Sequence, residues 1–121
     1  MHTLNLDQKA AQYAQNIVNH GGSDIENPVT KALGVLQEQG VYASVLYLLA
    51  NKHRQILSPL YDLLRELPAF QSSPDLPQDA KDILKFYSDN VCNNLDTLLL
   101  VKDLYEQTLI YARYGAKAAG K

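Results

Sequence analysis

Apolar residues recur at intervals of three and four along almost the whole chain, which is the spacing of one face of an α-helix. Sustained alternation of apolar and polar residues, the pattern of a half-buried β-strand, is not found in any stretch of the sequence. This pattern predicts an all-α protein. We expect a compact bundle of five to six helices with a long C-terminal helix, forming a single helical domain over residues 1–121.

The first half of the chain predicts three helices. The first is expected over about Leu6–Asn19. The second begins with Asn27 as the N-cap and Pro28 at the first helical position, and it ends at Gly40, where a residue without a Cβ suits a left-handed C-cap. The third helix, Val41 to about Lys52, is apolar on nearly every side, so we expect neighbours to enclose it at the centre of the fold.

The second half predicts three more helices and one connecting loop. Apolar residues continue at helical spacing from Ile56 to Leu67 and predict a fourth helical segment, for which Ser58-Pro59 is the expected start. Residues 69–77 contain two serines and two prolines and predict an exposed loop. A fifth helix is expected over Gln78–Val91. The last and longest helix is expected over Leu95–Ala119, after a break or cap at Asn93-Asn94.

The last helix carries two apolar lines. The first follows three-four spacing through its whole length and predicts the contact with the core: Leu98, Val101, Tyr105, Thr108, Ala112, Gly115 and Ala119. The second line, Leu100, Leu104 and Tyr111, lies about a third of a turn away, too far round the helix to share the same contact. We therefore interpret these three residues as a second contact surface, for a remaining helix or for another protein molecule.

Composition and charge exclude several classes of protein. Eleven Lys and Arg residues against thirteen Asp and Glu residues give a net charge of -2, which is not that of a protein coating nucleic acid by bulk charge. The single cysteine, Cys92, cannot form an internal disulfide, and no signal-peptide pattern is present, so a cytoplasmic location is expected. The longest apolar run, Val41–Ala50, has about half the roughly 20 residues of a membrane helix, so no membrane association is expected.

Motifs for catalysis and for metal binding are missing from the sequence. The three histidines do not stand at the spacing of zinc or di-iron ligands, and no glycine-rich phosphate loop occurs. Cys92 has acidic and amide residues around it but no cation that would stabilise a thiolate. We therefore expect a protein that is not an enzyme and that has no cofactor and no metal.

Positive charge is local. Residues 109–121 contain Arg113, Lys117 and Lys121 and no acidic residue, and the first two lie four residues apart on one face of the last helix. A second basic group, Lys52 and Arg54, follows the third helix. Arginine and lysine in such groups suit phosphate contacts. Cations near the C-terminus of a helix also complement its dipole without any ligand.

Three segments of the chain resemble a known protein family. Leu6–Ala14 looks like an opening amphipathic helix, Leu36–Leu48 is similar to a glycine-centred junction followed by an apolar helix, and Thr108–Ala118 looks like a closing helix with Thr, aromatic, Arg and Ala positions. In this order they resemble the small helical subunit of type III-B CRISPR effector complexes, the Cmr small-subunit family. The chain departs from that family by lacking a tryptophan near the final arginine and by having Leu109 in place of an acidic residue.

The resemblance implies a non-catalytic role in antiviral defence. Several copies would stack in a minor filament of an RNA-guided, RNA-targeting complex and contact the backbone of guide RNA and target RNA. The implied partners are the other Cmr complex subunits, copies of the chain itself, guide RNA and target RNA. Proteins that follow a duplex of any sequence contact its backbone and shape. The candidate phosphate contacts are Lys9, Lys52, Arg54, Arg113 and Lys117.

Three other interpretations remain open. The interpretation nearest to a type III-B small subunit is the analogous small subunit of type III-A (Csm) complexes. A free-standing helical adaptor with no RNA role would dock a partner helix on Leu100, Leu104 and Tyr111. A small helical regulator would bind an apolar ligand inside its bundle, although the sequence has no polar cluster to orient one.

Overall fold

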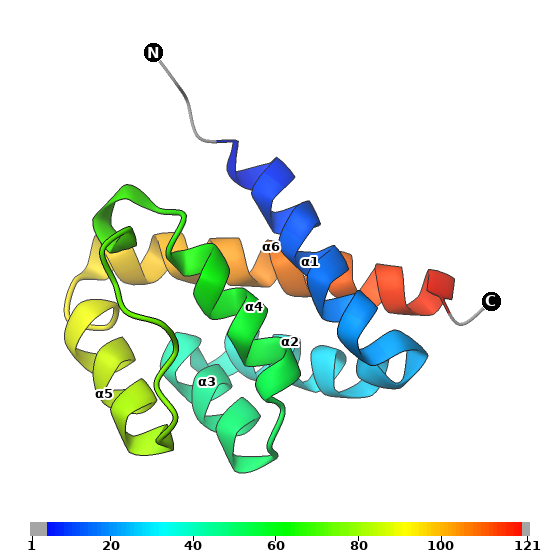
Figure 1. Ribbon diagram of the computed structural model, residues 1–121, viewed down its shortest axis with the longest axis horizontal. Coiled ribbons are helices and arrows are strands. Elements are labelled where there is room, and N and C mark those ends of the chain that lie inside the picture. The colour runs from blue at the N-terminus through cyan, green and yellow to red at the C-terminus, as the bar shows by residue number, and fades with distance from the viewer. Residues whose placement is uncertain (1–4, 120–121) are drawn as a thin grey trace.

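The computed structural model describes residues 5–119, which form a helical bundle with no β-strand among them (Figure 1). The predicted all-α class, the helix count and the long C-terminal helix are confirmed. The six α-helices and two short 3-10 helices are, in chain order, α1 (Leu6–Gly21), η1 (Gly22–Ile25), α2 (Glu26–Gln39), α3 (Val41–Ala50), α4 (Arg54–Leu64), η2 (Pro68–Phe70), α5 (Ala80–Asn90) and α6 (Leu95–Ala119).

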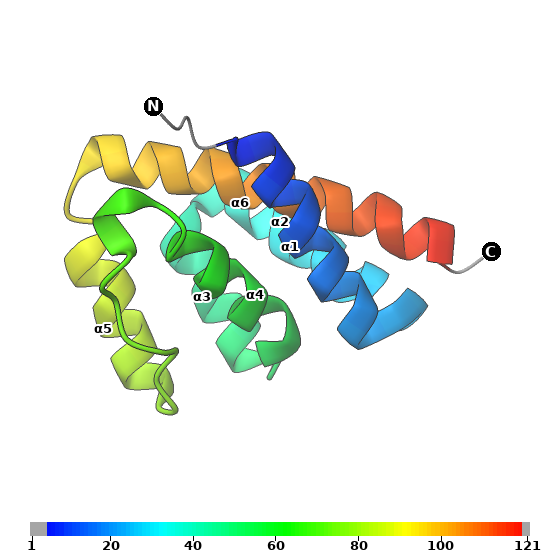
Figure 2. The same cartoon turned by 45° about the horizontal axis from the view of Figure 1, so that its top comes forward.

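The long helix α6 connects the two ends of the molecule (Figures 1 and 2). Helix α1 packs across it and makes the most extensive helix–helix contact of the fold, and α2 packs along it and makes the second most extensive one. Helices α3, α4 and α5 complete the bundle, with α3 in contact with all of α2, α4 and α5. At Gly115 of α6, a Cβ atom would lie only 3.1 Å from Cγ2 of Val18, so the missing side chain allows α1 to approach α6 closely.

The predicted apolar seam of α6 is largely confirmed. Its middle residues are buried, whereas Leu98 and Gly115 are half-buried and Ala119 is exposed. Thr108 is tolerated in the core because its Oγ1 donates a hydrogen bond of 2.7 Å to the carbonyl oxygen of Leu104. The buried residues of α6 are Val101, Leu104, Tyr105, Thr108, Leu109, Ala112 and Ala116.

Two buried tyrosines connect α5 to α6. The hydroxyls of Tyr87 and Tyr105 share a hydrogen bond of 2.6 Å, and both side chains are almost completely inaccessible to solvent. Tyr61 of α4 packs edge-on against Tyr87. Because each hydroxyl is the partner of the other, two polar groups are buried in the core without being left unpaired.

Several helix ends follow local sequence signals. Asn94 Oδ1 accepts a hydrogen bond of 3.0 Å from the backbone N–H of Thr97, which confirms a cap before α6. Gly40 has φ +100°, and its N–H donates to the carbonyl of Leu36 at 3.0 Å, so the predicted glycine stop of α2 is also confirmed. Asn27 as the N-cap of α2 was a wrong prediction, because η1 leads directly into α2 and the helix begins at Glu26.

Four other predictions about the helices are corrected by the structure. Helix α3 is not enclosed: Tyr42 and Leu46 are 40% and 46% exposed, since its neighbours cover the other side only. Helix α3 also ends at Ala50, before Lys52. Helix α4 begins at Arg54 and contains Pro59, since apolar residues on both sides of the proline are buried and offset the lost backbone hydrogen bond. Helix α5 is shorter at both ends than the sequence predicts.

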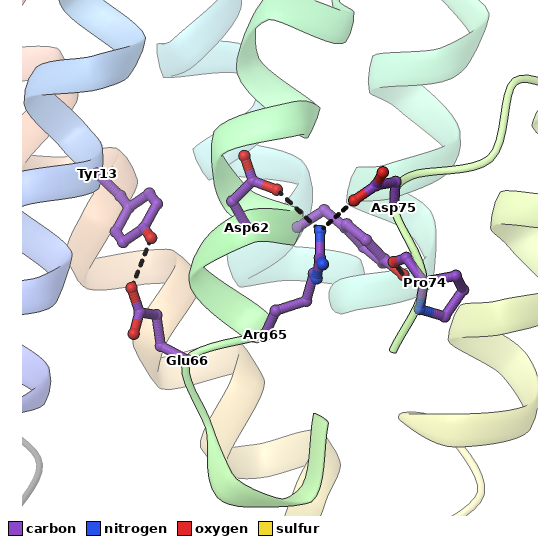
Figure 3. A network of polar contacts seen from close by, with 7 residues as sticks. Tyr13, Asp62, Arg65, Glu66, Pro74 and Asp75 are labelled. Atoms are coloured by element: carbon purple, nitrogen blue, oxygen red, sulfur yellow. Dashed lines mark hydrogen bonds and ion pairs between the residues drawn. The ribbon is translucent and has the colours of Figure 1, made fainter. Parts of the chain in front are cut away.

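The loop after α4 is tied to the bundle. Phe70 of η2 is buried, and the hydroxyl of Tyr61 donates a 2.7 Å hydrogen bond to the carbonyl of Pro74. Arg65 Nη1 contacts Asp75 Oδ1 at 3.0 Å (Figure 3). The predicted exposed loop is therefore a strap across α4, held by polar contacts. Within residues 5–119, no helix is long and apolar enough to cross a membrane.

The Tyr87–Tyr105 pair predicts a non-additive pair of substitutions. Either Tyr87→Phe or Tyr105→Phe leaves the other hydroxyl buried without its partner, and we expect each to lower the free energy of unfolding by about 1–3 kcal/mol. The double substitution removes both polar groups, so its cost is expected to be smaller than the sum of the two. Urea unfolding of the four proteins measures the coupling, and strictly additive costs would contradict the contact.

Candidate functional site

The five basic residues predicted to contact phosphate lie in three separate places. Lys9 is on α1, Lys52 and Arg54 are at the α3–α4 connection, and Arg113 and Lys117 are in the C-terminal half of α6. In both views the α3–α4 connection and the C-terminal end of α6 lie far apart (Figures 1 and 2). The structure therefore does not bring the five into one patch.

Lys9 is engaged by an acidic residue at the end of α4. Its Nζ lies 3.6 Å from Glu66 Oε2, and the same oxygen accepts a 2.6 Å hydrogen bond from the hydroxyl of Tyr13. About a third of each side chain of the ion pair is exposed. A phosphate at Lys9 would have to compete with Glu66, although a partly exposed ion pair of this kind contributes little to stability.

Arg54 and Lys52 differ in what their side chains do. The guanidinium of Arg54 donates to the carbonyl of Pro77 at 3.2 Å and to the carbonyl of Gln78, the backbone just before α5. Arg54 thus holds the loop against the start of α4. Lys52 has φ 60°, in the left-handed region, where it forms the sharp connection between α3 and α4, and its side chain is exposed.

Arg113 and Lys117 border a polar hollow between α6 and the start of α2. The hollow has a volume of about 430 Å³ and is lined by Arg113 together with Asp24, Glu26, Asn27 and Thr30. Lys117 Nζ lies 3.4 Å from Glu26 Oε2. The site therefore combines two cations with two carboxylates, all of them at or near the surface.

Arg113 has one buried polar atom without a partner. Its Nε makes no hydrogen bond within residues 5–119 and is inaccessible to solvent. A buried N–H group without an acceptor costs free energy. This nitrogen is therefore not one that a ligand in the hollow could reach.

The predicted contact line on α6 is partly covered by the chain itself. Leu104 is buried in the core, which corrects the expectation that it faces a partner, and the hydroxyl of Tyr111 donates to Asp7 Oδ1 at 2.5 Å. Leu100 remains 42% exposed. The start of α1 lies beside this part of α6. Between them is an open hollow of about 190 Å³, which is lined by Leu6, Asp7, Leu100, Asp103, Leu104 and Gln107.

Sequence reasoning did not find the acid-rich polar network at the end of α4 (Figure 3). Arg65 Nη1 lies between Asp75 Oδ1 at 3.0 Å and Asp62 Oδ1 at 3.7 Å. Burial raises the pKa of Asp62, and the Arg65 charge opposes that rise. The available signal was the helical spacing of Asp62, Arg65 and Glu66, although α4 ends at Leu64. Asp75 joins them only through the loop.

The described part of the chain gives no geometry for a metal site. Within residues 5–119, no group of three or more His, Cys, Asp and Glu side chains could hold an ion. Cys92 is half-buried, and this burial raises the pKa of its thiol, which disfavours the thiolate. His2 and Lys121 lie outside the described residues.

The contact between Tyr13 and Glu66 predicts a loss of stability at alkaline pH. Burial, followed by the hydrogen bond and the negative charge of Glu66, raises the pKa of Tyr13 from 10.0 to about 12. Between these values the unfolded chain releases the proton that the folded chain keeps, so the free energy of unfolding falls as pH rises from 10.0 to about 12. We expect this fall to be shallower in Tyr13→Phe.

Urea unfolding across that pH range tests the difference between the two proteins. Tyr114→Phe, which changes an exposed ring on α6, is the matched control and is expected to follow the parent protein. If Tyr13→Phe loses stability as steeply as the parent, the hydrogen bond to Glu66 does not hold the proton on Tyr13.

Comparisons of the chain with models of known protein families, with curated proteins and with solved structures find no match.

Proposed function

We propose that this chain is the non-catalytic small subunit of a type III-B CRISPR complex, a complex that uses a guide RNA to target RNA. Copies of the chain stack in a minor filament and contact the backbone of the guide and target RNA. The proposal starts from the three resembling segments. It is supported by where those segments lie in the fold.

The observation that carries the proposal is that these segments form one contiguous unit. Leu6–Ala14 lies on α1 and Thr108–Ala118 on α6, and these two helices make the most extensive helix–helix contact of the structure. Leu36–Leu48 spans the junction of α2 and α3, and α2 packs on the same α6. The glycine at the centre of that junction, Gly40, adopts φ +100°, which a residue with a side chain rarely adopts.

Within this proposal, the C-terminal half of α6 is the principal phosphate contact. Arg113 lines the open hollow beside the start of α2, and Lys117 has an exposed side chain that pairs with Glu26 at the edge of the same hollow. Lys52 offers an exposed charge at a second place. Arg54 is a weaker candidate, since its guanidinium donates to the backbone before α5. Lys9 is also weaker, since its partner Glu66 is held in place by the hydroxyl of Tyr13, and this ion pair is less exposed than that of Lys117 with Glu26. Repetition of few contacts over many copies then supplies avidity.

Two observations favour an alternative function, a helical adaptor without an RNA role. Leu95, Leu99 and Leu100 are exposed on α6, and an apolar hollow lies beside Leu100. An adaptor would use this surface for a partner helix. A second alternative is the small subunit of a type III-A complex, which would have the same fold. The other subunits that purify with the chain distinguish a type III-A complex from a type III-B complex.

Charge reversal at Arg113 and Lys117 tests the RNA contact. In a complex reconstituted from the remaining subunits and guide RNA, we expect Arg113→Glu with Lys117→Glu to weaken incorporation of this chain by about tenfold or more, because two phosphate contacts become repulsive. Circular dichroism is expected to show unchanged helical content. Incorporation is measured by titration of the labelled chain into the complex.

The matched control is Lys31→Glu with Lys81→Glu, which reverses two exposed lysines on α2 and α5. This control carries the same change in net charge and is expected to incorporate normally. Equal incorporation of both double variants would remove Arg113 and Lys117 from the RNA contact. Failure of the unmodified chain to join the complex would overturn the proposed function as a whole.

The isolated chain is expected to bind RNA weakly. With about two phosphate contacts, from Arg113 and Lys117, the slope of log affinity against log salt concentration on single-stranded RNA is about -1.4. Fluorescence anisotropy with labelled RNAs of unrelated sequence measures the affinity and its dependence on salt concentration. Tight binding that depends on sequence would contradict a subunit that reads only the backbone.

A further inference from the structure

Tyr114, near the end of α6, is an aromatic side chain that the fold leaves open to solvent. The chain has eight tyrosines, and Tyr114 is the most exposed of them at 63%, followed by Tyr42 at 40%. Within residues 5–119, no other aromatic ring packs against Tyr114. A single exposed ring is common on protein surfaces, so its surroundings decide what it can contact.

The surroundings of Tyr114 on its own helix are basic. Arg113 precedes it, and Lys117 follows it by three residues, which makes Lys117 its neighbour on the surface of α6. No Asp or Glu follows Glu106 in the sequence, and Glu106 stands eight positions before Tyr114, about 12 Å along the helix axis. Glu106 is also engaged, since it accepts a 2.9 Å hydrogen bond from Gln37. The ring therefore lies among cations on this helix, with no acid within two turns.

Two carboxylates of the neighbouring elements face a different side of α6 from Tyr114. Asp24 of η1 and Glu26 of α2 line the polar hollow with Arg113, and Tyr114 is not among the residues that line it. Around the helix axis, Tyr114 is turned about 100° from Arg113, and Lys117 lies between the two. The side chains of the ion pair between Lys117 and Glu26 are 47% and 38% exposed, so a phosphate can displace the carboxylate at little cost.

The surface next to the ring is open. One turn before Tyr114 stands Ile110, which is half-buried, and one turn after it stands Ala118, which is small and exposed. Gly115, which follows directly, has no side chain. The C-terminal end of α6 also lies at the edge of the bundle in both views (Figures 1 and 2). A flat group from another molecule therefore has room to reach the ring.

An open aromatic ring beside cations has the chemistry that binds unpaired nucleotides. Bases of single-stranded RNA stack on aromatic side chains, and Lys and Arg bind the phosphates between them. In a duplex both faces of a base are already stacked, so a duplex offers phosphates to Lys117 but no base to Tyr114. Stacking tolerates any sequence because every base has a flat face.

We infer that Tyr114 is a stacking site for an unpaired RNA base, with Lys117 and Arg113 on the phosphates next to that base. The inference rests on the proposed function for its choice of RNA as the partner, and it narrows that function. At this site the chain contacts an unpaired stretch of RNA, and it holds a base as well as the backbone. One stacked base in each copy adds to the few phosphate contacts without reading sequence.

The test compares Tyr114→Leu, which removes the ring, with Tyr114→Phe, which keeps it. By fluorescence anisotropy with labelled oligouridine at low salt, we expect Tyr114→Leu to raise the dissociation constant about fivefold or more and Tyr114→Phe to match the parent chain. On a blunt RNA duplex of the same length, Tyr114→Leu is expected to bind like the parent. The matched control is Tyr42→Leu on α3, which is expected to bind both RNAs like the parent.

The salt dependence separates stacking from charge. Stacking releases no counterions, so Tyr114→Leu is expected to lower the affinity for oligouridine without changing the slope of log affinity against log salt concentration. Lys117→Ala is expected to make that slope shallower by about 0.7, because one phosphate contact is lost. Circular dichroism monitors the folding of each variant.

A tryptophan reporter shows whether a base lies on the ring. The chain has no tryptophan, so Tyr114→Trp places a single indole at this position. Oligouridine is expected to quench its fluorescence, whereas an abasic oligonucleotide of the same length, which has the phosphates but no bases, is not. Tyr42→Trp is the control and is expected to respond to neither.

The outcomes separate a failure of this inference from a failure of the proposed function. A parent chain that binds neither RNA at low salt removes the RNA contact on which both depend. Normal binding of oligouridine by Tyr114→Leu, an equal loss on the duplex, or equal quenching by the abasic oligonucleotide overturns the inference alone. So does a Tyr114→Leu chain that binds RNA normally but fails to join the reconstituted complex, because the ring then contacts a protein subunit.

Discussion

The close packing of α6 against α1 is the contact on which the rest of this structure depends. Small residues make it possible: Ala10 and Ala14 on α1 and Ala112 and Ala116 on α6 are buried, and at Gly115 a side chain would press on the neighbouring helix. Helices that approach this closely gain dispersion contacts along their length and exclude water from the seam. The other helices then pack around this pair, and α6 keeps one face for solvent.

That arrangement divides the basic residues into those that the chain uses for itself and those that it leaves accessible. Arg54 fastens a loop, and Lys9 pairs with Glu66 beside Tyr13. Arg113 and Lys117 stand at the edge of the bundle, where the neighbouring carboxylates are themselves at or near the surface. A phosphate can compete with an exposed carboxylate far more easily than with a backbone carbonyl that the fold requires.

The spacing of apolar residues was sufficient to predict the six helices, whereas the partners of their side chains emerged only from the packing. The hydrogen bonds of a helix and of its caps join residues at most a few positions apart. The cap at Asn94, the helix end at Gly40 and the apolar seam of α6 could therefore be predicted from local sequence. The contact of Tyr111 with Asp7 joins residues 104 positions apart, and that of Arg54 with Pro77 crosses a loop. Such partners depend on how the helices pack, which local spacing does not encode.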